Sequence, residues 1–232
     1  MTFNPIGIIH SCYKEKFGIP RQAGLVAQAK ATLELLPDYR HPDSVRELEN
    51  FSHIWLIFVF HQSHTRQWKP TVRPPRLGGN QRVGVFASRS PNRPNPIGMS
   101  LVKLQKIEQS HNKLILHLLG ADLVDQTPVL DIKPYLPYAD SVPHAQAAYA
   151  DHAPEALLTV HFSDIAQQQC QQHKQGKEGD LQILITQILQ YDPRPAYKRT
   201  QSNDTRIYAM KLYHFDLRWH YLEEGIIEVI EL

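Results

Sequence analysis

The first two-thirds of the chain consists of short apolar runs that proline and glycine interrupt. Each run is rich in Val, Ile, Leu and Phe and has the length of a β-strand. The runs cover residues 6–10, 54–60, 82–87, 100–107, 114–119 and 129–132. Residues 25–36 are the exception, because their pattern predicts a short helix between Gly24 and Pro37. Since a closed sheet has no long free edge, the pattern as a whole predicts a small, mostly antiparallel β-barrel.

The last third of the chain alternates between strand and helix patterns. Residues 157–162 predict a strand, and Ser163 is the expected N-cap of a helix over 164–173. Asp180 is the expected N-cap of a second helix, which runs to Gln190.

Alternating apolar residues then predict a strand from 207 to 221. Gly225 supplies a turn before residues 226–232, so the chain is expected to end in a β-hairpin.

The expected fold is mixed but mainly β. It has a small antiparallel β-barrel over residues 1–141, a linker of low periodicity over 142–154, and a smaller α/β (α+β) domain over 155–232.

Positive charge is concentrated in one part of the chain. Residues 50–107 contain nine Lys or Arg and no Asp or Glu, although the formal net charge of the chain is only +2. Within this stretch, Arg89 and Arg93 lie in a proline-rich loop over 84–98. Proline fixes its own φ and restricts the preceding residue, so the loop is expected to be stiff. Guanidinium groups on a stiff loop suit a carboxylate or a phosphate, and a structural corner with solvated arginines is the alternative.

The sequence does not predict a metal site or a membrane span. Cys12 and Cys170 lack CxxC spacing, so we expect two free thiols. His61 and His64 would point to opposite faces of an extended segment, and no His-Glu-x-x-His pattern is present. A metal-dependent barrel enzyme that uses His53, His61 or His64 stays open as an alternative. No apolar run approaches 18 residues and the N-terminus has no signal pattern, so we expect a cytoplasmic protein.

Four segments of the barrel region resemble the TsaA/TrmO (YaeB-like) family. They are residues 51–56, 72–79, 84–95 and 131–135, and the resemblance extends over residues 3 to about 140. In the last third, only residues 192–197 are similar to the family. One departure is Gln126, where family members often carry Gly.

The resemblance implies an S-adenosylmethionine-dependent tRNA methyltransferase. Its substrate would be N6-threonylcarbamoyl adenosine at position 37 in the anticodon loop, and the resemblance also implies a homodimer. A non-catalytic RNA- or nucleotide-binding module is an alternative function for the same residues.

The resemblance implies that four segments hold the cofactor. They contain Pro20, Arg21, Gln22, His61, Gln62, Arg89, Asp122, Leu123, Val124 and Asp125. Arg89 would pair with the methionyl carboxylate, and Asp122 and Asp125 would accept hydrogen bonds from the ammonium or the ribose hydroxyls. Without the family pattern, turn formation is the better explanation of the two aspartates, because Asp readily bonds its own backbone.

The catalytic residues stay undetermined, with Asp131, Lys133 and Tyr135 as candidates. In a strand these three side chains point to one face. One of them can accept a proton or anchor the substrate. A buried Asp–Lys pair that supports the barrel is the structural alternative.

A basic tract interleaved with Trp68 predicts an RNA contact surface. The expected RNA-binding residues are Arg66, Lys69, Arg73, Arg76, Arg93, Arg194, Tyr197 and Lys198. A solvated basic face is the alternative, and it agrees with the modest net charge.

Overall fold

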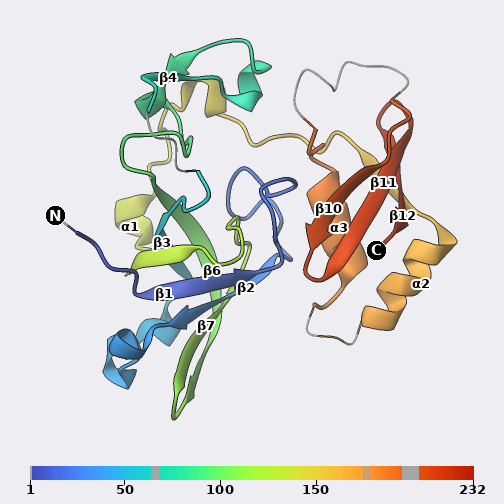
Figure 1. The fold of residues 1–232 in the computed structure, drawn as a ribbon. Helices are drawn as coiled ribbons and strands as arrows, with labels where there is room; N and C mark the ends of the chain where they lie inside the picture. Colours follow the sequence, from blue (N-terminus) through green and yellow to red (C-terminus); the bar gives the residue numbers. More distant parts are fainter. Residues whose placement is uncertain (1, 64–67, 175, 177, 195–203) are drawn as a thin grey trace. The chain divides into compact units, whose positions relative to one another are not determined.

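Six strands close into a barrel in the computed structural model, which describes residues 2–63, 68–174, 176, 178–194 and 204–232. In spatial order they are β1 (Gly7–Ser11), β2 (Lys30–Leu35), β7 (Lys113–Leu119), β6 (Ile97–Ser110), β3 (His53–Val59) and β8 (Pro128–Pro134). Figure 1 labels β1, β2, β3, β6 and β7 in the blue to green part of the chain. The predicted mainly β fold with an antiparallel barrel is confirmed.

Alternation of apolar residues explains why these segments form barrel strands. In β3, Ile54, Leu56 and Phe58 are buried while the residues between them are half-buried. Gly98 of β6 lies opposite Phe58, and a Cβ atom there would lie 2.3 Å from the ring. The absence of a side chain at position 98 therefore makes room for the Phe58 ring inside the barrel.

The remaining elements of this region are short. Strands β4 (Thr71–Val72) and β5 (Val83–Gly84) form a two-stranded ribbon, and α1 (Pro137–Asp140) follows β8. Six 3₁₀ turns complete the region: η1 (Pro37–Tyr39), η2 (Pro42–Val45), η3 (Leu48–Asn50), η4 (Pro75–Leu77), η5 (Val85–Ala87) and η6 (Ala148–Ala150).

Within the described residues, the C-terminal region has a four-stranded sheet and two helices. The sheet has the order β10 (Tyr208–Leu212), β11 (Phe215–Glu223), β12 (Ile226–Glu231) and β9 (Thr159–Phe162), and only the β12–β9 pair is parallel. Helices α2 (Asp164–His173) and α3 (Leu181–Leu189) contribute Ala166, Leu184 and Ile188 to the core that also contains Trp219 of β11. Both predicted caps are confirmed: Ser163 Oγ accepts the Ala166 N–H at 3.1 Å, and Asp180 Oδ1 accepts the Ile183 N–H at 3.1 Å.

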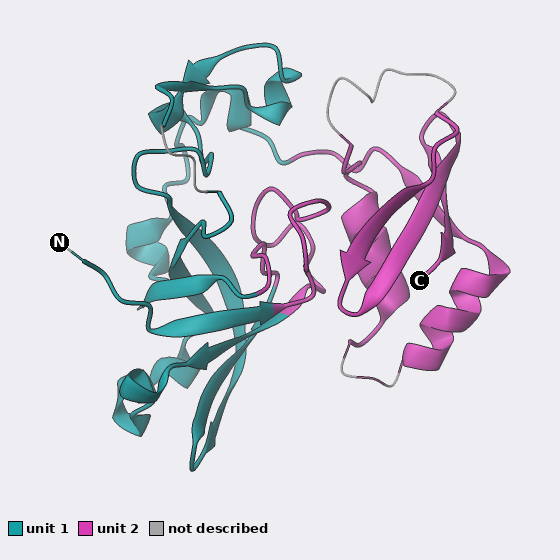
Figure 2. Cartoon of the chain, in the orientation of Figure 1, with its two compact units in different colours: residues 1–10, 31–119, 126–153 teal, residues 11–30, 120–125, 154–232 magenta. Residues whose placement is uncertain are grey.

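The chain forms two compact units that do not follow its linear order (Figure 2). Unit 1 contains residues 1–10, 31–119 and 126–153, and unit 2 contains 11–30, 120–125 and 154–232. Segments 11–30 and 120–125 thus pack with the C-terminal residues.

Cys12 and Cys170 consequently belong to the same hydrophobic core, where both are free thiols. Burial raises the pKa of the Cys12 thiol to about 12.

Three sequence predictions of secondary structure were wrong. The stretch 25–36 is not a helix, because Ala31, Leu33 and Leu35 alternate inward in β2, which lies between β1 and β7 of the barrel. Residues 82–87 form the short β5 followed by a 3₁₀ turn. The run 207–221 is two strands, because Tyr213 turns the chain with a φ of 55°.

No helix in the described part of the chain is both long and apolar enough to cross a membrane.

Candidate cofactor and RNA site

The acidic loop, residues 122–125, is held by the chain that follows β1. Asp125 Oδ1 accepts the Ser11 N–H at 2.9 Å, and Asp125 Oδ2 lies 2.8 Å from Lys14 Nζ. The Asp125 N–H donates to the Tyr13 carbonyl at 2.7 Å. The carboxylate of Asp125 therefore contributes to loop structure. Asp122, like Asp125, is half-buried.

A glycine pair brings the segment 20–22 close to this loop. The Gly24 N–H donates to the Gly120 carbonyl at 2.8 Å, and both residues have positive φ, 82° and 73°. A Cβ atom on Gly120 would lie 3.3 Å from Gly24 Cα. Because Gly24 follows Gln22 by two residues and Gly120 precedes Asp122 by two, two of the predicted cofactor segments are neighbours in unit 2.

The arginine loop and the end of β3 are neighbours in unit 1. The Phe60 N–H donates to the Pro96 carbonyl at 2.8 Å, so His61 and Gln62 follow a residue that contacts the end of the loop. Arg89 is exposed, whereas Arg93 turns back and donates from Nη1 to the carbonyls of Ser88 at 3.2 Å and Ser90 at 3.4 Å. Arg93 thus ties the loop together, and Arg89 presents a guanidinium on its surface.

Side chains of serine and tyrosine further restrain the arginine loop. Ser88 Oγ donates to the Val85 carbonyl at 2.8 Å, and the Asn92 N–H donates to Ser90 Oγ at 3.2 Å. The hydroxyl of Tyr149, in η6, donates to the Ala87 carbonyl at 2.8 Å. These bonds and the prolines limit the conformations open to the backbone around Arg89.

Of the three catalytic candidates, Asp131 and Lys133 lie in β8 and Tyr135 directly follows it. Lys133 Nζ is 2.9 Å from Asp131 Oδ2, with 65 % and 48 % of the two side chains exposed. The Asp–Lys pair considered from the sequence is therefore present, but it is exposed and not buried. Tyr135 packs edge-on against His53 and lies 6.2 Å from the Trp55 ring centre.

A pocket of about 550 Å³ lies beside turns η1 to η3 in unit 1. Asp131 contributes to its wall, but none of the ten predicted cofactor residues does.

Among the described residues, no group of three or more His, Cys, Asp or Glu side chains is arranged to hold a metal ion.

The basic tract of unit 1 is exposed where it is described. Lys69, Arg73 and Arg76 are exposed, and 48 % of Trp68 is exposed. Arg76 donates to the carbonyl of His152. Arg66, Tyr197 and Lys198 were also predicted to bind RNA, and they lie outside the described residues.

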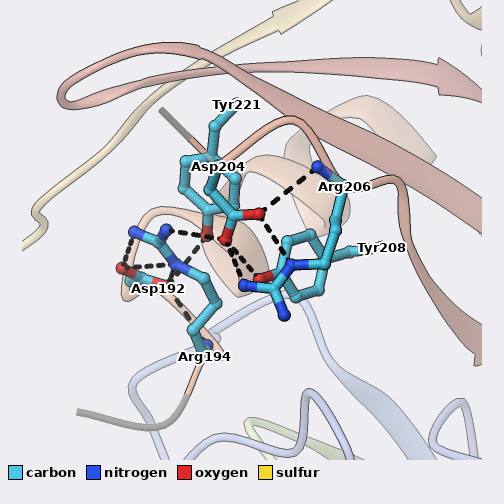
Figure 3. A network of polar contacts seen from close by, with 6 residues as sticks. All are labelled: Asp192, Arg194, Asp204, Arg206, Tyr208 and Tyr221. Atoms are coloured by element: carbon cyan, nitrogen blue, oxygen red, sulfur yellow. Dashed lines mark hydrogen bonds and ion pairs between the residues drawn. The ribbon is translucent and has the colours of Figure 1, made fainter. Parts of the chain in front are cut away.

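Arg194 is buried in a polar network and not part of an exposed basic patch (Figure 3). Only 5 % of the residue is exposed. Its Nη2 donates to Asp192 Oδ2 at 2.8 Å, its Nη1 lies 3.6 Å from Asp204 Oδ2, and its Cζ lies 3.6 Å from the centre of the Tyr221 ring. The sequence missed this role because Asp204 is ten residues further along the chain.

Hydrogen bonds within the network stabilise the ionised carboxylates. Burial alone would raise the pKa of Asp192, but the hydrogen bonds from Arg194 and Tyr221 hold this pKa below its usual value. The pKa of Asp204 is well below its usual value, chiefly because Arg206 donates to it, and Tyr208 also donates to it. The carboxylates and guanidinium groups of the network are therefore ionised and paired at neutral pH, and Tyr208 and Tyr221, whose pKa values are raised by burial, donate to the carboxylates as neutral hydroxyls.

Two residues near the acidic loop have no signal in the sequence. Ser11 and Lys14 contact this loop from more than 100 residues away along the chain. No spacing rule relates them to Asp125, so only the fold reveals the contact.

Two models of one tRNA-methyltransferase family match successive parts of the chain. The model of the tRNA-methyltransferase O N-terminal domain matches residues 8–141, and the model of the TrmO C-terminal domain matches residues 155–232. The chain belongs to the TrmO family, and the resemblance inferred from the sequence is confirmed.

Relatives with similarity over the whole chain support this assignment. A tRNA (adenine(37)-N6)-methyltransferase of Escherichia coli K12 is 49 % identical over 96 % of this chain and 94 % of its own length. A putative S-adenosylmethionine-dependent methyltransferase, RcsF, of Pseudomonas aeruginosa is 45 % identical over 100 % and 97 %. The crystal structure of TrmO from Pseudomonas aeruginosa superposes with a TM-score of 0.82 at 39 % identity, covering 100 % of this chain and 97 % of that one.

Proposed function

We propose that this protein transfers a methyl group from S-adenosylmethionine to N6 of threonylcarbamoyl adenosine at position 37 of tRNA. The observation that carries the proposal is the family match over both halves of the chain, together with relatives named as adenine-37 N6-methyltransferases. The threonylcarbamoyl group on the base is inferred from the resemblance to the family.

The chemistry of the available groups fits S-adenosylmethionine. The exposed guanidinium of Arg89 suits the methionyl carboxylate, and the half-buried carboxylate of Asp122 suits the ammonium or the ribose hydroxyls. The close approach of Gly24 and Gly120 leaves backbone groups of both segments near the acidic loop. When bound, the cofactor supplies an electrophilic methyl group on a sulfonium.

The protein's own contribution to the rate is chiefly positioning. Holding the two reactants in line supplies a large part of the barrier reduction in such transfers. Arg93, Ser88 and Ser90 fix the backbone that presents Arg89, and Lys14 and Ser11 fix the loop that presents Asp122.

The proton of the attacking nitrogen also has to leave. Asp131, Lys133 and Tyr135 stay the candidates for this step, and Asp131 is the one that carries a carboxylate. Lys133 Nζ lies 2.9 Å from this carboxylate.

We further propose RNA contacts along the exposed tract of Lys69, Arg73 and Arg76, where cations and Trp68 alternate.

From the family resemblance alone, we propose a homodimer in the cytoplasm. Light scattering of the purified protein tests the dimer, and cell fractionation tests the location.

Nucleoside mass spectrometry of tRNA from a strain without the gene tests the function in cells. We expect the N6-methylated threonylcarbamoyl nucleoside to disappear and its unmethylated precursor to accumulate. Expression of the wild-type gene should reverse both changes, and an unchanged nucleoside profile would contradict the proposal.

A further inference from the structure

Ser11 is buried at the end of β1, and its hydroxyl forms hydrogen bonds with backbone groups of Leu123 and Tyr13. Only 6 % of the residue is exposed. Ser11 Oγ donates to the Leu123 carbonyl at 2.7 Å and accepts the Tyr13 N–H at 3.2 Å. The Ser11 N–H donates to Asp125 Oδ1 at 2.9 Å. One residue thus contacts the acidic loop through both its backbone and its side chain.

The segment that follows Ser11 is attached to the C-terminal sheet. The Tyr213 N–H donates to the Cys12 carbonyl at 2.7 Å, and Tyr13 forms an isolated β-bridge with Leu212. The side chains of Cys12 and Tyr13 are fully buried in the core of unit 2. Residues 11–13 therefore join the acidic loop on one side to β10 on the other.

An ion pair supports the loop beside the hydrogen bonds of Ser11. Lys14 Nζ lies 2.8 Å from Asp125 Oδ2, with 36 % of the Lys14 side chain and 17 % of the Asp125 side chain exposed. The two oxygens of Asp125 are thus directed at two different parts of segment 11–14.

We infer that Ser11 is a positioning residue that holds the acidic loop in its cofactor-binding conformation and connects this loop to the C-terminal sheet. The inference rests on the proposed function, because it concerns binding of S-adenosylmethionine. Ser11 acts through the backbone of residues 122–125 and does not contact the cofactor. The C-terminal sheet thereby supports the cofactor site, in addition to any contact with RNA.

Removal of the hydroxyl leaves two polar groups without their partner. In Ser11→Ala, the Leu123 carbonyl and the Tyr13 N–H lose the oxygen between them. A buried polar group without a partner is costly, so the loop is expected to shift until both groups reach water or new partners. The shift displaces Asp122, which is next to Leu123 in the chain.

Ser163→Ala is a matched control for this substitution. Ser163 Oγ also donates to a backbone carbonyl, that of Ile230 at 2.6 Å, and accepts a backbone N–H, that of Ala166 at 3.1 Å. Both serines belong to unit 2. The control removes the same two kinds of hydrogen bond at the start of α2, away from the acidic loop in sequence.

Calorimetry with S-adenosylmethionine and steady-state kinetics test the inference. We expect Ser11→Ala to raise Kd and KM for S-adenosylmethionine about tenfold, with little change in KM for tRNA. Ser11→Thr, which keeps the hydroxyl, should restore most of the affinity. Ser163→Ala should lower Tm by about 2–4 °C and leave Kd unchanged.

Lys14→Gln gives a second test if Ser11→Ala does not fold. Because Lys14 is at the surface, this variant should fold and should weaken S-adenosylmethionine binding about threefold. Wild-type affinity in folded Ser11→Ala, or in Lys14→Gln when Ser11→Ala does not fold, would overturn the inference. Failure of the wild-type protein itself to bind S-adenosylmethionine would instead overturn the proposed function.

Discussion

The guanidinium of Arg194 lies over the ring of Tyr221, with 3.6 Å between Cζ and the ring centre. The same guanidinium pairs with Asp192, just after α3, and lies 3.6 Å from Asp204, just before β10. Arg194 therefore links two parts of the C-terminal region that are twelve residues apart in sequence, counted from Asp192 to Asp204. This buried position gives it a structural role.

Arg194→Met should destabilise the fold strongly. The substitution leaves Asp192 and Asp204 in place without their shared cation, and breaking a buried pair costs about 3–5 kcal/mol. Urea unfolding measures the loss. Arg218→Met is the matched control, because Arg218 pairs with Glu231 at 2.9 Å on the surface and such pairs contribute about 0–1 kcal/mol. Equal losses in the two variants would show that Arg194 has no special structural role.

The network should also make stability depend on acid. The pKa of Asp204 is lowered in the folded state, so the unfolded chain binds its proton at a higher pH than the folded chain. The stabilising contribution is complete above a pH of about 4 and is lost as the pH falls further. Thermal unfolding between pH 7 and pH 3 should show a steeper acid decline for the wild type than for Asp204→Asn. Parallel declines would contradict the assigned cause.

The two aspartates of the acidic loop should respond differently to substitution by Asn. Asp122→Asn is expected to weaken S-adenosylmethionine binding, because its carboxylate is proposed to accept hydrogen bonds from the ammonium or the ribose hydroxyls. Asp125→Asn is expected to lower Tm as well, because it weakens the contacts with Ser11 and Lys14.

Arg89→Ala should weaken S-adenosylmethionine binding more than tenfold in a folded protein, since a charge-assisted contact is worth roughly 1.5–3 kcal/mol. Unchanged affinity in Arg89→Ala would remove Arg89 from the site.

Salt dependence tests the proposed RNA contacts of the basic tract. If Lys69, Arg73 and Arg76 each contact a phosphate, changing all three to Gln should flatten the slope of log affinity against log salt by about two units. Affinity for S-adenosylmethionine should not change. Changing Lys103, Lys106 and Lys113 to Gln removes the same charge from β6 and β7 and should leave the slope as it is. Equal slopes for both variants and the wild type would favour a solvated basic face.

Local rules were sufficient where one segment determines its own structure. Ser163 and Asp180 begin helices because a cap depends on a side chain and an amide two or three residues away. Length and apolar content likewise predicted β3 and β7, in which alternate residues are buried in the barrel core. These signals are contained within about ten residues.

Predictions from the sequence were wrong or incomplete where distant segments determine the outcome. Residues 30–35 form a strand between β1 and β7, and the alternation of Ala31, Leu33 and Leu35 was a local signal for it that the helix prediction over 25–36 did not use. Arg194 is buried because Asp204 and Tyr221 meet it in the folded chain. Ser11 meets Leu123 for the same reason, at a separation of 112 residues.

The family pattern contains one detail that the structure explains. Gln126 stands where family members often carry Gly, and its φ is 66°, in the left-handed region that favours glycine. Its amide nitrogen lies 3.1 Å from His10 Nδ1, so the side chain has a local partner. The turn is therefore formed with a residue other than glycine.

Methyl transfer by the purified protein to defined tRNA tests the central claim most directly. The protein is incubated with methyl-labelled S-adenosylmethionine and one tRNA prepared in two forms, with threonylcarbamoyl adenosine or with adenosine at position 37. Nucleoside mass spectrometry then locates the label. We expect one labelled methyl group on N6 of threonylcarbamoyl adenosine 37 and much less on the unmodified tRNA. Binding of both ligands without methyl transfer, or label at another nucleoside, would contradict the proposed function.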